Sequence, residues 1–166
     1  MGVLEMFGIG SAARRRIAWT IALAATVASL SCVPTDEVIW IGFSASDRYL
    51  ACATRQGHLY IADLEKNEKR EITNEASDGG FAWSPAARAD DRLAFCIRRE
   101  GAWDLAVADP AGTITLLTRD EWRDFHPAWS PDGRGIYYVA SRGGGYQGDY
   151  DIHYYDMASG QSFPLI

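Results

Sequence analysis

The feature that most constrains the fold of this 166-residue chain is a sequence unit that occurs three times after residue 37. Each unit contains a serine that follows a short apolar segment, and these serines are Ser44, Ser84 and Ser130. Each unit also contains an aspartate that ends a run of alternating residues, and these aspartates are Asp63, Asp109 and Asp156. Spacings of about 40 to 47 residues are typical of repeats that bury their faces on one another. The chain is therefore predicted to be an array of similar units.

The third unit is interpreted as four antiparallel strands joined by turns. Ser130 to Gly133 form a Ser-Pro-Asp-Gly turn, in which Pro fixes φ and Gly supplies a positive φ. Residues 135–141 are rich in aromatic and β-branched side chains, and residues 151–156 alternate in polarity. Such a repeat is typical of a β-propeller blade, and a β-sandwich is the second interpretation. The predicted fold is all-β, a partial β-propeller of about three four-stranded antiparallel blades at residues 38–73, 81–118 and 126–166.

The third unit also carries a family resemblance. Its sequence HPAWSPDGRGIYYVASRGG, followed by DIHYYDMASG, resembles the repeat of TolB-type (WD40-like) β-propellers. The second unit keeps Trp83-Ser84-Pro85 but has a longer stretch in place of Asp-Gly, and the first has Phe43-Ser44 at this place. The matched residues are blade signatures, so the resemblance implies a fold more than an activity. In the Tol system the propeller protein contacts peptidoglycan-associated and outer-membrane lipoproteins, which implies that class of partner.

The N-terminal residues 1–32 are predicted to be an export signal that forms a hydrophobic helix, and residues 33–37 a linker. Three arginines, Arg14 to Arg16, precede a short apolar segment at residues 17–30. Cleavage after Ala28 or Ser31 would give a soluble periplasmic protein. The sequence Ser-Leu-Ser-Cys also resembles a lipobox, which would make Cys32 a lipid anchor in the cell envelope. An uncleaved anchor and a buried core helix are further alternatives.

Charge and strand direction indicate where a partner would bind. The formal net charge of −6 argues against nucleic acid as a partner. Because the strands of a blade alternate in direction, the turns after each second strand and the links between blades share one end of the array. Loops at the end of a rigid scaffold often carry function, so this end is predicted to bind a protein or small ligand. The alternative is that these residues only build turns and cap loops. The residues predicted on this face are Arg55, Asp78, Arg99, Glu100, Asp124 and Arg142.

No catalytic residue, metal site or cofactor is predicted from the sequence. A Gly-x-Ser-x-Gly elbow is missing, and the three repeated serines are expected to bond nearby backbone. Asp149, Asp151 and Asp156 lack the glycine and the terminal glutamate of a calcium loop. Cys52 and Cys96 lie in equivalent strands of different blades, too far apart for a disulfide. Both cysteines are therefore expected to be small buried side chains.

The number of blades leaves three alternatives open. Propellers typically have four to eight blades, and an array of three would expose an apolar face at either end. Trp83, Trp129 and Phe43 occupy equivalent positions and are expected to pack between blades. The chain is then a fragment of a longer propeller, half of a six-bladed homodimer, or a separate arc of blades.

The sequence predicts a non-catalytic, exported β-propeller that binds a partner or acts as a scaffold in the bacterial cell envelope. The alternative is the N-terminal part of the propeller domain of an enzyme. Prolyl-oligopeptidase-like peptidases and oligogalacturonate-lyase-like enzymes have similar blades. Further blades after Ile166 followed by a serine elbow would favour the peptidase, and further blades alone would favour the binding protein.

Overall fold

The computed structural model describes residues 36–86, 90–141 and 150–165, and these residues form β-strands and turns. Within the described residues, no helix is long and apolar enough to cross a membrane. The predicted export signal and Cys32 lie outside the described residues, as does Arg142. The strands are β1 Val38–Phe43, β2 Tyr49–Thr54, β3 Leu59–Asp63, β4 Glu68–Thr73, β5 Ala76–Trp83, β6 Leu93–Arg99, β7 Ala102–Ala108, β8 Ile114–Leu116, β9 Arg123–Trp129, β10 Gly135–Ser141, β11 Tyr150–Asp156 and β12 Gln161–Pro164.

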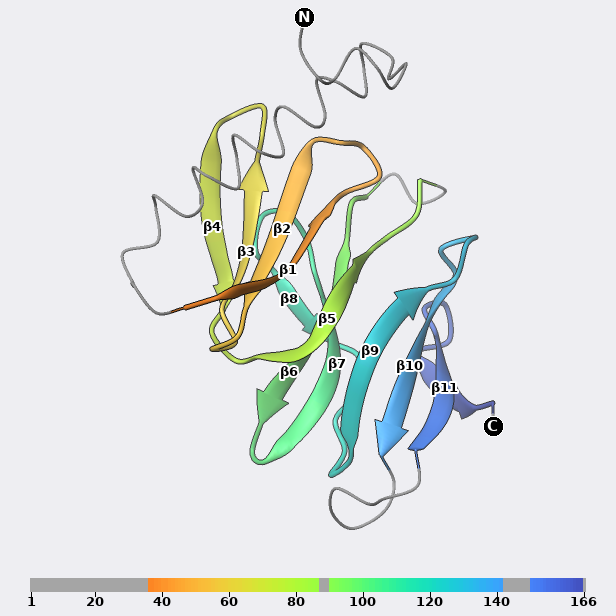
Figure 1. Ribbon diagram of the computed structural model, residues 1–166. Coiled ribbons are helices and arrows are strands. Elements are labelled where there is room, and N and C mark those ends of the chain that lie inside the picture. Colours follow the sequence, from red (N-terminus) through yellow and green to blue (C-terminus); the bar gives the residue numbers. More distant parts are fainter. Residues whose placement is uncertain (1–35, 87–89, 142–149, 166) are drawn as a thin grey trace, which may run out of the picture. The chain divides into compact units, whose positions relative to one another are not determined.

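The strands form three four-stranded antiparallel meanders, which we call blade 1 (β1–β4), blade 2 (β5–β8) and blade 3 (β9–β12) (Figure 1). Blades 2 and 3 are joined by one parallel pair, Trp103 with Arg123, where the Trp103 N–H donates to the Trp122 carbonyl at 3.3 Å. The predicted all-β arrangement of repeated antiparallel blades is confirmed. Each described strand lies beside strands of its own blade, in the order in which the chain makes them.

The first strands of the three blades, β1, β5 and β9, lie side by side as the innermost strands (Figure 1). They begin at Val38, Ala76 and Arg123, so the last two start earlier than the predicted blade limits of 81 and 126. Each pairing with the second strand contains a register shift, and β5 and β9 have positive φ at Gly80 (84°) and His126 (51°). These β-bulges break the two-residue alternation, which hid the first half of β5 and of β9 from the sequence pattern.

The blades pack by placing small side chains against large ones. We define the following face of a blade as the side toward the next blade along the chain, and the preceding face as its other side. On the following face of blade 1, Ala51 and Ala53 of β2 belong to one buried cluster with Leu93 and Phe95 of blade 2. Small side chains on β2 let the large ones of β6 approach closely, which gives the dense packing of a protein interior.

The junction between blades 2 and 3 repeats this arrangement. Ala94 and Cys96 of β6 lie in a buried cluster with Ile136 and Tyr138 of β10. Cys52 and Cys96 are both buried and free, which confirms the sequence prediction for these two residues. Burial raises the pKa of both thiols, so both stay protonated and unreactive at neutral pH.

One tryptophan in blade 2 and one in blade 3 bond to the blade before. Trp83 donates its indole N–H to the Gly42 carbonyl at 2.9 Å, and Trp129 donates to the Ala82 carbonyl at 3.1 Å. Both acceptors lie one residue before the equivalent aromatic position of the preceding blade, Phe43 or Trp83. The predicted packing of these two tryptophans between blades is confirmed. Phe43 stands at the same position of blade 1, where it is partly exposed.

Replacing Trp129 with phenylalanine is expected to lower the free energy of unfolding by about 1 kcal/mol, because the Ala82 carbonyl loses its donor while most of the apolar contact remains. Urea unfolding monitored by circular dichroism measures the change. Tyr137→Phe is the control, since Tyr137 is exposed on blade 3, and it should change stability by less than about 0.5 kcal/mol. Equal effects of the two substitutions would contradict the role of the indole bond.

Candidate functional site

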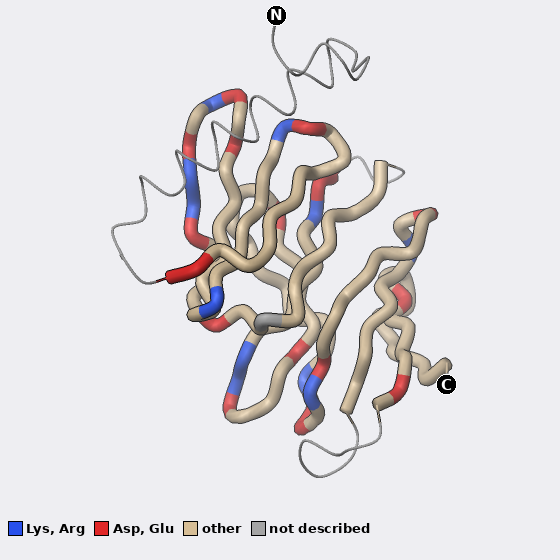
Figure 2. The backbone as a smooth tube through the Cα atoms, in the orientation of Figure 1, with Lys and Arg blue, Asp and Glu red and all other residues tan. Residues whose placement is uncertain are grey.

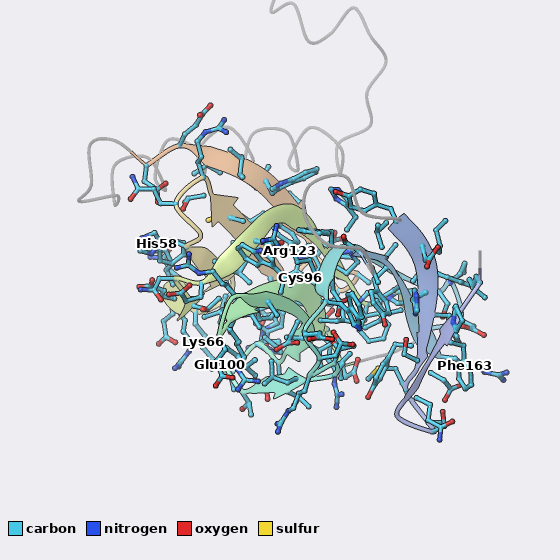
Figure 3. All side chains as sticks on the ribbon, turned by 90° about the horizontal axis from the view of Figure 1, so that it is seen from below. His58, Lys66, Cys96, Glu100, Arg123 and Phe163 are labelled. Carbon is cyan, nitrogen blue, oxygen red and sulfur yellow. The ribbon has the colours of Figure 1, made fainter. Side chains whose placement is uncertain are left out.

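A cavity of about 410 Å³ lies at the end of the strands where β2 turns into β3 and where the links between blades run. Residues from all three blades line it, so the arrangement of the blades creates the cavity. Figure 3 looks toward this end of the molecule, with Arg123 near the middle of the view and Glu100 at its margin. The lining residues are Arg55, Gln56, Gly57, Asn74, Glu75, Ala76, Arg98, Trp103, Arg123 and Phe125.

Blades 1 and 2 each supply this end with an arginine–glutamate pair. The Arg55 Nη2 lies 2.9 Å from Glu37 Oε2, and the Arg98 Nε lies 2.8 Å from Glu75 Oε2. In both blades the backbone N–H of the arginine also donates to the carbonyl of the same glutamate at 2.8 Å. The hydrogen bond to Glu75 raises the pKa of Arg98, so this guanidinium remains charged. The backbone bonds fix the base of each arginine, and each side chain remains largely exposed toward the cavity.

Blade 3 has an arginine where blades 1 and 2 have the glutamate of this pair. By strand register, Arg123 occupies the position that Glu37 and Glu75 occupy in the other blades, and it pairs with Ser141 on β10. Three arginines and one glutamate line the cavity, and Glu37 pairs with one of these arginines, which leaves one positive charge in excess. A positively charged cavity with aromatic walls, here Trp103 and Phe125, suits a ligand that carries a carboxylate or phosphate beside an apolar group.

The structure places the predicted face residues in different surroundings. Arg55 lines the cavity, as described above. Arg99 instead lies with its Nη1 3.6 Å from Asp104 Oδ2, and Glu100 is exposed in the β6–β7 turn with φ of 48°. Asp78 lies within β5 rather than in a link between blades, and its side chain lies outside the description.

The prediction that Asp124 is displayed on this face is wrong. Asp124 lies within β9 and is only 1% exposed. Its Oδ2 accepts a hydrogen bond from the Thr118 hydroxyl at 2.6 Å and one from the Leu105 N–H at 3.3 Å. Burial raises its pKa to about 7, although the Thr118 hydroxyl bond partly opposes that rise. Asp124 therefore joins β9 to β7 and to the link between blades 2 and 3.

Several cavity residues were missed from the sequence. The sequence aligned Arg55 with Arg99, whereas the strand register aligns it with Arg98, because the turn after β6 begins one residue later. Arg123 was missed because the start of β9 was not recognised. Glu37 and Glu75 each stand one residue before an innermost strand. This repeated glutamate could have indicated where the innermost strands begin.

The repeated serines and aspartates build turns. The hydroxyl oxygens of Ser44, Ser84 and Ser130 accept the backbone N–H of a residue at or just before the second strand, at 3.2, 2.9 and 3.0 Å respectively. These bonds confirm the expected backbone role of the serines. Asp156 Oδ1 accepts the N–H groups of Ala158 and Ser159, and the bond from Ser159 lowers the pKa of Asp156.

The potential metal ligands of the described residues are spread over the blades. In that part of the chain, no group of three His, Cys, Asp or Glu side chains could hold a metal ion. Asp149, one of the three aspartates considered from the sequence, lies outside the described residues.

Comparison with known proteins identifies the fold. No protein-family model matches the chain. The uncharacterized protein Atu1656 of Agrobacterium fabrum is 31% identical over 87 residues, which cover 52% of this chain and 29% of that protein. The crystal structure of TolB from Acinetobacter baumannii matches 78% of this chain and 32% of its own, with a TM-score of 0.59 at 21% identity. The chain has a TolB-like β-propeller fold.

Two further solved structures support this fold. A protein assigned as TolB from Agrobacterium tumefaciens matches 81% of this chain and 50% of its own, with a TM-score of 0.61 at 18% identity. Dipeptidyl peptidase 4 from Porphyromonas gingivalis matches 82% of this chain and 20% of its own, with a TM-score of 0.58 at 15% identity. The chain thus spans half or less of the length of each of these relatives.

Proposed function

We propose that this chain is a non-catalytic β-propeller protein of the bacterial cell envelope that binds an acidic segment of a partner protein in the arginine-lined cavity. The observation that carries the proposal is the convergence of Arg55, Arg98 and Arg123 on one cavity. The first two arginines pair with Glu37 and Glu75, so the arginines outnumber the glutamates by one. Guanidinium groups bind carboxylates through paired, charge-assisted hydrogen bonds, and an aromatic wall adds apolar contact. The hydroxyl oxygens of the three repeated serines accept backbone N–H groups in turns, which agrees with a non-catalytic role.

Two features support an envelope location. The N-terminal sequence has the basic and apolar regions of an export signal, and it ends in Ser-Leu-Ser-Cys. Two of the solved structures with this fold carry the name TolB. Mass spectrometry of the chain expressed in a Gram-negative host tests export: processing should remove the first 28 or 31 residues, and a lipid on Cys32 would identify the lipoprotein form. An unprocessed N-terminus in the soluble cytoplasmic fraction would contradict export.

The binding proposal predicts a specific loss of affinity. An amidated peptide that contains Glu beside Leu should bind and change the tryptophan fluorescence of the protein, since Trp103 lines the cavity. Arg98→Gln should weaken binding by about tenfold or more, because a charge-assisted hydrogen bond contributes roughly 1.5–3 kcal/mol. The affinity of the unmodified protein should also fall with salt.

The matched control is Arg134→Gln, which removes the same charge from a highly exposed arginine in the β9–β10 turn, at the opposite end of the strands. This variant should bind the peptide like the unmodified protein. Equal binding by all three proteins, or equal binding of a peptide with Gln in place of Glu, would overturn the proposal.

A second candidate function is the propeller domain of a larger peptidase, favoured by the similarity to dipeptidyl peptidase 4. Reading the gene beyond Ile166 distinguishes the two candidates. A downstream serine elbow with its histidine and acid would favour the peptidase. Further blades alone would favour the binding protein.

A further inference from the structure

Two buried carboxyl groups lie directly behind the wall of the arginine-lined cavity. Trp103 and Arg123, which both line the cavity, form the parallel pair that joins blades 2 and 3. The next residue in each strand is an aspartate, and Asp104 and Asp124 are 3% and 1% exposed. Successive side chains of a strand point to opposite faces, so Asp124 points away from the side of Arg123 and Phe125. Figure 2 shows acidic and basic residues close together along β7 and at the start of β9.

The carboxyl group of Asp124 is surrounded by neutral donors and by other acids. Its two hydrogen-bond donors, a hydroxyl and a backbone N–H, are both uncharged. In the strand register Ala140 of β10 lies opposite it and brings no charge. The titratable groups that face Asp124 are Cys96 of β6, Asp104 of β7 and Asp120 of the link between blades 2 and 3, while Arg99 of β6 and Arg119 of the link act on Asp104.

The charge of Asp124 changes in the neutral pH range. Burial raises its pKa to about 7, so the protonated and ionised forms are both populated near neutral pH. The arginines of the cavity outnumber the glutamates around them by one. An ionised Asp124 next to Arg123 offsets this single positive charge, whereas a protonated Asp124 leaves it intact. Two unit charges about 10 Å apart near a protein surface alter each other's binding by about tenfold.

We propose that the binding of an acidic peptide in this cavity is coupled to protonation of Asp124, so that the affinity rises as the solution becomes more acidic. The inference rests on the proposed function, since it concerns the regulation of the same site. The coupling is reciprocal, because a bound carboxylate also favours the protonated form of Asp124. The protein therefore takes up protons from the solvent when it binds.

Fluorescence titration between about pH 6 and pH 8.5 at constant salt tests the proposal, with the peptide that contains Glu beside Leu acetylated and amidated at its ends. The peptide glutamate stays ionised throughout, because it titrates near 4.3. For the unmodified protein we expect the affinity to be roughly fivefold higher at the lowest pH than at the highest. Asp124→Asn should bind with the higher affinity at every pH, since asparagine remains neutral. Equal pH profiles for the two proteins would overturn the coupling.

Two histidines near the cavity provide the matched controls, because imidazoles also gain charge in this pH range. His126 follows Phe125 and is exposed, and His58 follows Gly57. Asparagine tolerates a positive φ, so His126→Asn is compatible with the φ of 51° at this position. His126→Asn and His58→Gln should both keep the pH dependence of the unmodified protein. If either variant loses it while Asp124→Asn keeps it, the coupling belongs to an imidazole and the proposal is wrong.

Proton uptake gives a readout that needs no variant. Calorimetry of peptide binding at about pH 7, in two buffers with different ionisation enthalpies, should show uptake of roughly half a proton per peptide. Binding without proton uptake, at the same affinity at each pH, would overturn the coupling and leave the proposed function standing. Absence of binding at every pH would overturn the proposed function, and the coupling with it.

Discussion

Replacing Asp124 with asparagine is expected to stabilise the protein at pH 8 and to flatten its stability profile between about pH 4 and pH 7. Asp124 is almost fully buried, and this burial raises its pKa to about 7. In the unfolded chain an aspartate titrates near 3.9, about three pKa units lower. Between these two values the folded protein binds more protons than the unfolded chain, so the free energy of unfolding falls as the pH rises.

The size of this effect follows from the shift. Each pKa unit corresponds to about 1.4 kcal/mol. The free energy of unfolding of the unmodified protein therefore falls by about 4 kcal/mol at most, and this fall is complete above about pH 7. An asparagine has no charge to bury, and its amide oxygen can still accept the Thr118 hydroxyl. Burial also raises the pKa of Asp104 on β7, and Asp120 and Asp104 add like charge near Asp124, so neighbouring acids act in the same direction.

Urea unfolding at about pH 4, 6 and 8 measures the stability of the variant and of the unmodified protein between the unfolded and folded pKa values of Asp124. Asp124→Asn should gain stability over the unmodified protein at the highest pH and differ little from it at the lowest. Asp132→Asn is the control. The pKa of Asp132 is lowered by its hydrogen bond from Ser130, so this substitution should cost stability at neutral pH. Parallel stability profiles for Asp124→Asn and the unmodified protein would show that folding does not raise the pKa of Asp124.

Replacing Gly135 with alanine is expected to lower the free energy of unfolding by about 3 kcal/mol or more. Gly135 begins β10, and a Cβ atom there would collide with the ring of Tyr154 and with the carbonyl oxygen of Tyr155. The carbonyl belongs to the paired strand, so it cannot move without disturbing the ladder. Overpacking of a well-packed site typically costs about 1–3 kcal/mol and occasionally more.

Gly101→Ala is the matched control for the backbone. Gly101 has a φ of 93°, but nothing lies within 4 Å of the added Cβ, so only conformational strain of about 1 kcal/mol is expected. Thermal unfolding of both variants measures the difference. If Gly135→Ala is no more destabilised than Gly101→Ala, the ring of Tyr154 can leave this position and the packing described for blade 3 is wrong.

The repeated turn residues predicted the architecture well, because each makes a bond within a few residues of itself. Ser130 accepts the N–H of Gly135, and Asp156 accepts the N–H groups of the following turn. Such local bonds leave a signature at fixed spacing in every blade, whatever the neighbouring blades contribute. The sequence therefore predicts the blades more reliably than it predicts their surfaces.

The candidate site could be predicted only in part. Arg55 was recognised, whereas Arg98 and Arg123 depend on a turn length and on a β-bulge near His126 that the spacing does not reveal. The burial of Asp124 depends on Thr118, which reaches it from the link between blades 2 and 3. Contacts between segments from different blades are set by packing, which a single sequence does not record.

The central claim is that consecutive blades stack so that the tryptophan of each blade donates to the innermost strand of the blade before it. Nuclear magnetic resonance of the ¹⁵N-labelled protein tests this claim most directly. The indole N–H groups of Trp83 and Trp129 should be protected from hydrogen exchange, with nuclear Overhauser effects to Gly42 and Ala82, respectively. Rapid exchange of both indoles, with no contact to the preceding blade, would contradict the stacked arrangement.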